Sequence, residues 1–240
     1  MPLRFLIQTS PPGVGRQIQL DAERTHYLCK VMRIRNGDEV ECFNGAGVVF
    51  RATLLNTHHK QATLQVCAVE PALTPQTPVV HLALSVLKGQ AMDRALQQAT
   101  ELGVAQLSLL QAKRSNVTLK SDRADNKLTH WQKVIAAACE QCGQLFVPSI
   151  TPPVSIADHL ASSDIKTLVL DQDGAPFPAT LAFTDIQLLI GPEGGWDESE
   201  RLLFEQRGLQ TYSIAPYTLR AETSPAVALA TVYHAQQRGR

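Results

Sequence analysis

The segment LIGPEGG, residues 189–195, joins a short apolar strand to the start of a helix. The strand covers residues 187–190, and Asp197 and Glu200 have the spacing of a capping box at the helix start. Glycines lack a Cβ, so a segment with three of them allows positive φ angles and close approach of a ligand to the backbone. A tight strand-to-helix connection explains the same residues, and both interpretations stay open at this point.

An alternation of strands and helices extends on both sides of this segment. Apolar runs of strand length occupy residues 79–87, 105–110, 167–170 and 211–214. Apolar residues at helical spacing indicate helices over residues 92–102 and 128–141, and Ser224-Pro225 opens a last helix. This alternation predicts an α/β domain with a mostly parallel sheet and helices on both of its faces.

The first part of the chain follows a different pattern. It has short segments rich in Val, Thr and Leu at residues 16–20, 39–43, 48–55 and 62–69, with one helical stretch at residues 21–31. Asn36-Gly37-Asp38 and Asn44-Gly45 are turn signals between strands. Three prolines within residues 71–78 then indicate a linker. We expect a small β-rich domain over residues 1–72 and an α/β domain over residues 73–240.

Composition excludes several classes of protein. The chain has 240 residues, of which 44% are hydrophobic, and it has no apolar run long enough to span a bilayer. The N-terminus lacks the apolar region of a signal peptide, and five cysteines argue against a disulfide framework. We therefore expect a cytoplasmic protein.

The charge is balanced overall but unevenly distributed. The formal net charge is zero, yet residues 1–133 carry 16 Lys and Arg against 10 Asp and Glu, and the rest carries the opposite excess. Such a chain can offer a basic face to phosphates while staying neutral as a whole. An uneven distribution without functional meaning is the alternative.

Polar and glycine-rich loops follow three of the predicted strands, at residues 171–174, 191–195 and 215–220. Ligands of open α/β sheets bind beyond the carboxyl ends of the strands, so these loops are the candidate site. Neither the dinucleotide-binding nor the phosphate-binding glycine motif is present, which disfavours nicotinamide cofactors and nucleoside triphosphates. In the segment LRAET, residues 219–223, Arg220 can hold a phosphate or orient a base, and Glu222 can cap the next helix. A structural Arg220–Glu222 pair is the alternative.

Together, these segments resemble the 16S ribosomal RNA uridine-N3 methyltransferases, a family of the knotted (SPOUT) methyltransferase superfamily. LIGPEGG and LRAET are similar to the last two signatures of that family. Further similar segments are KGQAMD at 88–93, ATELGV at 99–104, WQK at 131–133, AACEQCG at 137–143, HYL at 26–28, VMR at 31–33 and FNG at 43–45. The similar segments occur in the family's order over most of the chain.

The resemblance implies a fold and a reaction that spacing alone does not. It implies a C-terminal parallel-sheet domain with a deep trefoil knot, which general rules would not predict. It also implies a small PUA-like β-barrel that binds RNA, a homodimer, and 16S rRNA or the small ribosomal subunit as partner. The expected reaction is methylation of N3 of a uridine, at the position numbered 1498 in 16S rRNA, with S-adenosylmethionine (SAM) as cofactor.

The resemblance also assigns residues to the site. The expected cofactor-binding residues are Leu170, Ile190, Gly191, Pro192, Glu193, Gly194, Gly195, Ile214, Ala215, Tyr217, Thr218 and Leu219. The expected RNA-binding residues are Arg4, Lys30, Arg33, Arg35, Lys88 and Arg94. The expected catalytic residues are Arg220 and Glu222, with Arg220 stabilising the uracil anion or holding a phosphate. Glu222, Glu193 and Glu101 are the candidate general bases, and the sequence does not choose among them.

Some residues depart from the family pattern. Ala215 replaces a glycine, Tyr217 stands where a charged contact is possible, and Gln144 replaces an arginine that would contact phosphate. The spacing Cys139-x-x-Cys142 can belong to a redox or zinc site, but no second pair follows, so we predict a buried helix face and no metal. Ribose 2′-O-methylation and an RNA-binding module without catalysis are the alternative functions.

Overall fold

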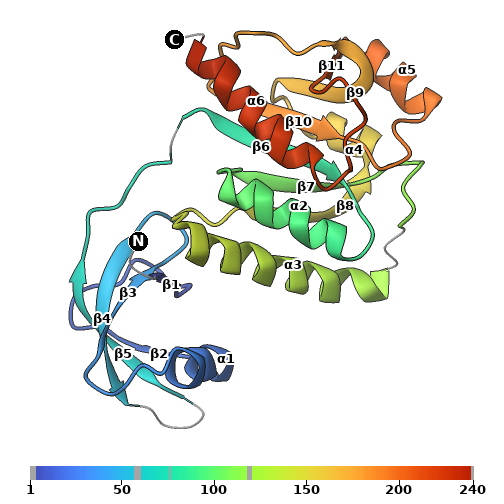
Figure 1. The fold of residues 1–240 in the computed structure, drawn as a ribbon. Helices are drawn as coiled ribbons and strands as arrows, with labels where there is room; N and C mark the ends of the chain where they lie inside the picture. Colours follow the sequence, from blue (N-terminus) through green and yellow to red (C-terminus); the bar gives the residue numbers. More distant parts are fainter. Residues whose placement is uncertain (1–3, 57–60, 76, 118–120, 239–240) are drawn as a thin grey trace. The chain divides into compact units, whose positions relative to one another are not determined.

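The computed structural model describes residues 4–56, 61–75, 77–117 and 121–238 (Figure 1). The chain forms two compact units. The N-terminal unit comprises Met1–Pro75 together with Cys139–Val147, and the C-terminal unit comprises Gln76–Ala138 together with Pro148–Arg240. Among the described residues, no helix has both the length and the apolar character needed to cross a membrane.

The N-terminal unit is a five-stranded sheet with strand order β1-β3-β4-β5-β2. Its elements are β1 (Arg4–Leu6), β2 (Gln17–Gln19), α1 (Ala22–His26), the π-helix η1 (Tyr27–Val31), β3 (Glu39–Phe43), β4 (Val49–Asn56) and β5 (Thr63–Val69). Strands β1 and β3 pair in parallel, and the other pairs are antiparallel. The predicted strands and helix are thus present. Strand β1 was not predicted, because three residues are too few to show a strand pattern.

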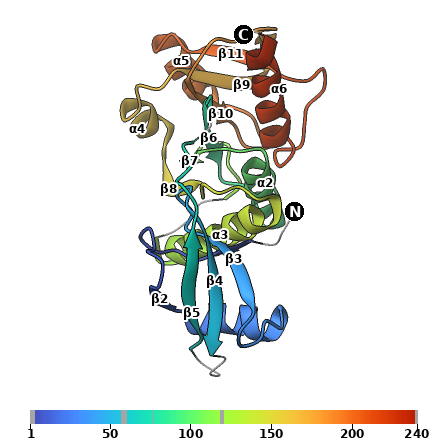
Figure 2. The ribbon, with the colours of Figure 1, turned by 90° about the vertical axis from the view of Figure 1, so that its left-hand side faces the viewer.

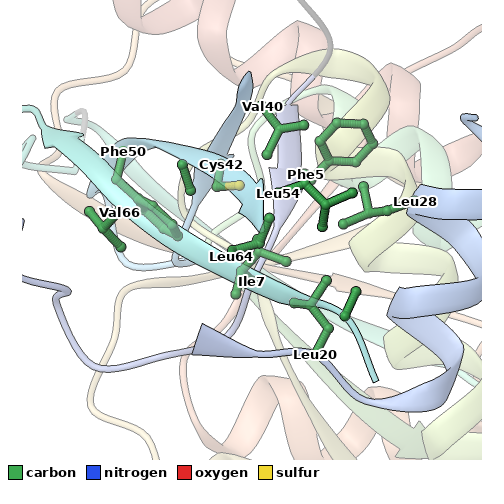
Figure 3. Close-up of a cluster of buried hydrophobic side chains, with 12 residues drawn as sticks. Phe5, Ile7, Leu20, Leu28, Val40, Cys42, Phe50, Leu54, Leu64 and Val66 are labelled. Carbon is green, nitrogen blue, oxygen red and sulfur yellow. The ribbon is translucent and has the colours of Figure 1, made fainter. Parts of the chain in front are cut away.

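The strands of this unit close around one apolar core. Figure 3 shows that side chains from β1, β3, β4, β5 and the helical segment converge, among them Phe5, Leu28, Val40, Leu54 and Leu64. Alternate residues of β4 enter this core, because side chains alternate between the two faces of a strand. Leu54 is 1% exposed, whereas its neighbour Leu55 is 39% exposed.

Residues 139–147 contribute a buried carboxylate to the N-terminal unit. The Glu140 Oε1 accepts hydrogen bonds from the Leu6 backbone N–H at 2.9 Å and from Arg24 at 2.7 Å. Burial raises the pKa of the neighbouring Cys139 thiol to about 12, so this thiol stays protonated near neutral pH. All five cysteines are free, and the described residues contain no cluster of His, Cys, Asp and Glu suited to a metal.

The C-terminal unit is a six-stranded sheet with strand order β11-β9-β10-β6-β7-β8, and all of its strand pairs are parallel. The strands are β6 (Val79–Ser85), β7 (Gln106–Gln111), β8 (Ser149–Ser155), β9 (Thr167–Pro176), β10 (Asp185–Ile190) and β11 (Gln210–Ser213). The helices are α2 (Gln90–Glu101), α3 (Ser121–Cys142, of which residues 139–142 belong to the N-terminal unit), α4 (Ile156–Ala161), α5 (Glu198–Gln206) and α6 (Ser224–Arg238). The predicted α/β class with a parallel sheet is confirmed.

Helices cover both faces of this sheet, as Figure 2 shows. On one face, α4 and α5 pack on a core that includes Ala83, Val169, Leu189, Trp196 and Phe204. On the other face, α2 and α6 pack against each other. The central strands are therefore buried on both sides, which explains their nearly continuous apolar sequence.

Two strands differ from the prediction for identifiable reasons. Strand β8 was not predicted, because it contains Pro152 and Pro153 and proline argues against a strand in the interior of a sheet. The structure tolerates both prolines because β8 is an edge strand. Strand β9 continues to Pro176, well past the apolar run that ends at Leu170, so the loop predicted at residues 171–174 is wrong and these residues belong to the strand. Its extension passes close to β11, since a Cβ on Gly174 would lie 2.6 Å from the Tyr212 backbone nitrogen.

The alternation of Leu54 and Leu55 makes a matched pair for a stability test. We expect Leu54→Ala to lower the free energy of unfolding by about 2–5 kcal/mol, because it leaves a cavity in the core. We expect Leu55→Ala to change it by less than about 1 kcal/mol. Urea denaturation followed by circular dichroism measures both values, and equal losses would contradict the core described above.

Candidate functional site

A cavity of about 300 Å³ lies beside residues 170–173 of β9 and at the carboxyl ends of β10 and β11. These three strands are neighbours in the sheet, so the loops that follow β10 and β11 meet beside β9. The lining residues are Leu170, Asp171, Gln172, Asp173, Ile190, Gly191, Pro192, Glu193, Gly194, Gly195, Trp196, Arg201, Tyr212, Ser213, Ile214, Ala215, Tyr217, Thr218, Leu219, Ala221 and Ser224. The cavity is thus at the place where ligands of parallel sheets bind.

The glycine segment forms the central wall and is held tightly. The Trp196 indole N–H donates to the Leu170 carbonyl oxygen at 2.9 Å, which ties the β10–α5 loop to β9. A Cβ on Gly191 would lie 3.1 Å from the Trp196 ring. Gly195 has a φ of +68°, a conformation that L side chains rarely adopt. The glycines therefore serve both a tight turn and a wall of the cavity.

The loop after β7 braces the glycine segment from outside the cavity. A Cβ on Gly194 would lie 3.1 Å from the Arg114 Cβ, and the Arg114 guanidinium donates to the Gly194 carbonyl oxygen at 3.4 Å. The Lys113 backbone N–H donates to Glu200 at 2.7 Å, and the Lys113 ammonium donates to Ser199 at 2.6 Å. This contact joins segments about eighty residues apart in sequence.

The helix that follows the glycine segment begins with the predicted capping box. The Asp197 side chain accepts from the Ser199 backbone N–H at 3.1 Å, and Glu200 accepts from the Asp197 backbone N–H at 2.7 Å. Hydrogen bonds from the Ser199 hydroxyl and backbone N–H lower the pKa of Asp197. The helix start is therefore fixed directly beside the cavity.

An ion pair lies within the lining of the cavity. Arg201 contacts the Asp171 carboxylate at 2.8 Å and Asp173 at 3.3 Å. The Asp171 side chain is 4% exposed. Because a buried carboxylate requires a partner, the Arg201 guanidinium compensates for the burial of Asp171, and the ion pair connects α5 to β9.

The loop between β11 and α6 forms the third wall. At its start, the Ala215 carbonyl oxygen accepts from the Ser213 hydroxyl at 3.0 Å and from the Gln172 amide at 3.4 Å. At its end, the Arg220 carbonyl oxygen accepts from the Thr223 backbone N–H at 2.9 Å. Both ends of the loop are thus held by hydrogen bonds.

All of the expected cofactor-binding residues lie in this one lining: Leu170, Ile190, Gly191, Pro192, Glu193, Gly194, Gly195, Ile214, Ala215, Tyr217, Thr218 and Leu219. Their role in binding a cofactor stays a prediction. The lining and bracing residues that were not predicted include Lys113, Arg114, Trp196 and Arg201. Their contacts join distant segments, so no local sequence signal could have found them.

The expected catalytic residues lie in the third loop but outside the lining. Arg220 is exposed and Glu222 is half-buried. Among the described residues, neither side chain makes a hydrogen bond or ion pair, so the alternative of a structural Arg220–Glu222 pair is not supported. Glu193 is exposed and belongs to the lining. Glu101 is the last residue of α2, a helix that begins at the carboxyl edge of the sheet and runs away from it. Its carboxylate accepts a hydrogen bond from the Gln97 amide at 2.8 Å.

The expected RNA-binding residues differ in their surroundings. In the C-terminal unit, Lys88 and Arg94 are exposed and lie between β6 and the first turns of α2, at the sheet edge that carries the cavity. In the N-terminal unit, Lys30, Arg33 and Arg35 are exposed in the segment before β3.

The side chains of Lys30, Arg33 and Arg35 make no ion pair among the described residues. Arg4, in contrast, forms an ion pair with Glu41, which neutralises much of its charge. The unpaired cations before β3 are therefore the better candidates for phosphate contacts.

Comparison with known proteins identifies the family. The model of the RNA methyltransferase domain matches residues 75–233, and that of the RNA methyltransferase PUA domain matches residues 20–67. A Synechocystis protein named ribosomal RNA small subunit methyltransferase E is 31% identical over 224 residues, 90% of this chain and 72% of the relative. The Bacillus subtilis protein of the same name is 29% identical, covering 89% of this chain and 88% of its own.

Two solved structures are similar over nearly the whole chain. A Legionella pneumophila methyltransferase in complex with SAM is 28% identical, with a TM-score of 0.88 and 96% of both chains covered. The small subunit methyltransferase E of Neisseria gonorrhoeae, bound to SAM, is 26% identical, with a TM-score of 0.85 and 96% of both chains covered. The chain therefore belongs to the RNA methyltransferase family that includes the ribosomal RNA small subunit methyltransferase E proteins, with a PUA-like N-terminal domain.

Proposed function

We propose that this chain is a SAM-dependent methyltransferase that modifies N3 of a uridine in 16S rRNA. The observation that carries this proposal is the cavity between β9 and the loops after β10 and β11, which is lined by the glycine segment and every expected cofactor residue. Relatives with the same architecture bind SAM and are named for methylation of the small-subunit RNA.

The chemistry of the lining fits SAM. Apolar side chains of Leu170, Ile190, Ile214 and Leu219 offer surfaces for an adenine ring, and the glycine segment presents backbone donors and acceptors. The volume of about 300 Å³ is at the lower end of the range for small-molecule sites. The residues present therefore fit the cofactor that the family binds.

When bound, SAM supplies an electrophilic methyl group on a sulfonium sulfur. The bond from methyl carbon to sulfur breaks as the bond to uracil N3 forms, and the N3 proton leaves to a base. In our proposal, the Arg220 guanidinium stabilises the negative charge that develops on the uracil ring. Its exposure and lack of an ion-pair partner among the described residues leave this charge available to substrate.

A carboxylate takes the N3 proton in this scheme. Glu193 belongs to the cavity lining, and Glu222 follows Arg220 in the third loop. Glu101 is disfavoured within one chain, because it lies at the far end of α2 from the carboxyl edge. We therefore assign the proton acceptor to Glu193 or Glu222.

The N-terminal unit supplies RNA affinity in this proposal. Its match to the RNA methyltransferase PUA domain and the exposed cations Lys30, Arg33 and Arg35 support this role. In the C-terminal unit, Lys88 and Arg94 offer exposed positive charge at the sheet edge that carries the cavity. Phosphate contacts of this kind position the RNA without reading its sequence.

Membership of the family supports further proposals about the assembled protein. We infer a domain division near residue 73, a trefoil knot in the C-terminal domain and a homodimer that binds RNA across both subunits. We also infer a cytoplasmic location and methylation at the uridine position expected from the sequence resemblance. The product distinguishes the alternatives: a ribose methyltransferase yields 2′-O-methyluridine, and a binding module yields no methylated nucleoside.

Gly195 and Gly208 form a matched pair for testing the cofactor site. Both have positive φ, +68° and +65°, and an added methyl group would meet open space at either position. Each change to Ala should therefore cost about 1–2 kcal/mol of backbone strain. We expect only Gly195→Ala to weaken SAM binding, by roughly 5- to 10-fold, because only Gly195 lines the cavity. Calorimetry with SAM measures this, and equal SAM affinities of the two variants would contradict the assignment.

Arg220→Ala tests the proposed stabilisation of the uracil anion. We expect kcat for methyl transfer to small-subunit RNA to fall about 100-fold or more, with unchanged SAM affinity, since the guanidinium acts on the transition state. Arg220→Lys keeps a positive charge and should retain part of the activity. Transfer of a labelled methyl group measures kcat. Full activity of a folded Arg220→Ala protein would refute this role.

Arg33→Asn tests the RNA surface of the N-terminal unit. Arg33 has a φ of +57°, which Asn tolerates, so this change removes the charge without forcing a new backbone conformation. We expect lower RNA affinity. The slope of log affinity against log salt concentration should also fall by about one, because one fewer counterion is released when RNA binds. Arg51→Ala is the control, because Arg51 already pairs with Glu39 at 2.9 Å. An identical salt dependence of the Arg33 variant and the unmodified protein would exclude a phosphate contact.

A further inference from the structure

Tyr217 has the largest exposed fraction among the large hydrophobic residues that the structure describes as exposed. Its exposed fraction is 81%, although it belongs to the residues that line the cavity. Its hydroxyl makes no hydrogen bond, and its ring makes no aromatic contact, with any described residue. An isolated exposed apolar side chain elsewhere on a surface needs no explanation. This one stands at the rim of the candidate active site.

The loop that carries Tyr217 is held at both ends. Hydrogen bonds to the Ala215 carbonyl oxygen fix its start, and Ala221, which is buried, fixes its end together with the hydrogen bonds to the Arg220 carbonyl oxygen. Because the flanking backbone is anchored, the ring is presented at a defined place beside the cavity. An anchored aromatic ring loses little conformational entropy when a partner binds.

The resemblance to the family assigns Tyr217 to the cofactor, but its exposure argues for a partner outside the cavity. The ring of Trp196, which packs among the other lining residues, is only 2% exposed. In contrast, four-fifths of the Tyr217 surface faces solvent, and the exposed Arg220 follows three residues later. An exposed aromatic ring and an unpaired cation in one loop can together bind single-stranded RNA, through stacking on a base and contact with a phosphate.

We propose that Tyr217 is a positioning residue for RNA, on which the uracil that receives the methyl group stacks when it leaves the RNA structure. This inference rests on the proposed function. An enzyme that modifies a ring atom hidden by base pairing or stacking must bind the base in an unstacked position. Stacking on the Tyr217 ring replaces the stacking that the base loses. The Arg220 guanidinium, from the same loop, stabilises the negative charge that develops on the uracil ring.

Three substitutions separate stacking from other roles. Tyr217→Phe keeps the aromatic face, Tyr217→Leu keeps apolar bulk without a flat ring, and Tyr217→Ala removes both. We expect Tyr217→Phe to stay within about 2-fold of the unmodified enzyme. Tyr217→Leu and Tyr217→Ala should raise KM for small-subunit RNA and lower kcat/KM by roughly 5- to 100-fold, the range measured for loss of one stacked base. The SAM affinity of all three variants should stay within about 2-fold.

Leu202→Ala is the matched control, because Leu202 is an exposed apolar residue of α5 that does not line the cavity. Its kinetic constants should be unchanged. Thermal denaturation of each variant confirms that it is folded. Activity of Tyr217→Ala or Tyr217→Leu equal to that of Tyr217→Phe would overturn the stacking role. Parallel loss of SAM affinity and activity would also overturn it, by placing the ring on the cofactor. Absence of methyl transfer by the unmodified protein would instead refute the proposed function.

Discussion

The parallel pairing of β9 with β10 and β11 is the constraint on which the site depends. It places the loops that follow β10 and β11 beside residues 170–173 of β9, and these three segments enclose one cavity. Helices α4 and α5 bury one face of the sheet, and α2 and α6 cover the other. The hydrogen bond from the Trp196 indole to the Leu170 carbonyl oxygen ties the loop after β10 to β9.

Much of this arrangement could be predicted, because local sequence and general rules determine it. Buried strands such as β10 require apolar runs, the capping box at Asp197 marks a helix start, and the ligand edge of a parallel sheet follows from topology. The bracing of Gly194 by Arg114 and the pairing of Arg201 with Asp171 could not be predicted. These contacts join segments far apart in sequence, and nothing in either segment alone specifies its partner.

In the loop after β11, the exposure of each side chain indicates its role as clearly as the sequence motif does. Arg220 and Tyr217 share one loop with buried Ala221, and their exposure separates them from the apolar wall formed by Ile214 and Leu219. In this account the inner surface of the loop holds the methyl donor and its outer surface meets RNA. The same loop thus positions both SAM and the uridine. Holding two reactants in the correct orientation increases the rate of the reaction between them.

The central claim is that the glycine-lined cavity transfers a methyl group to N3 of a uridine in 16S rRNA. Nucleoside mass spectrometry of 16S rRNA from a strain that lacks the gene tests it most directly. The account predicts that 3-methyluridine disappears and returns when the unmodified gene is restored. Unchanged 3-methyluridine in the deletion strain, or loss of a ribose-methylated uridine in its place, would contradict it.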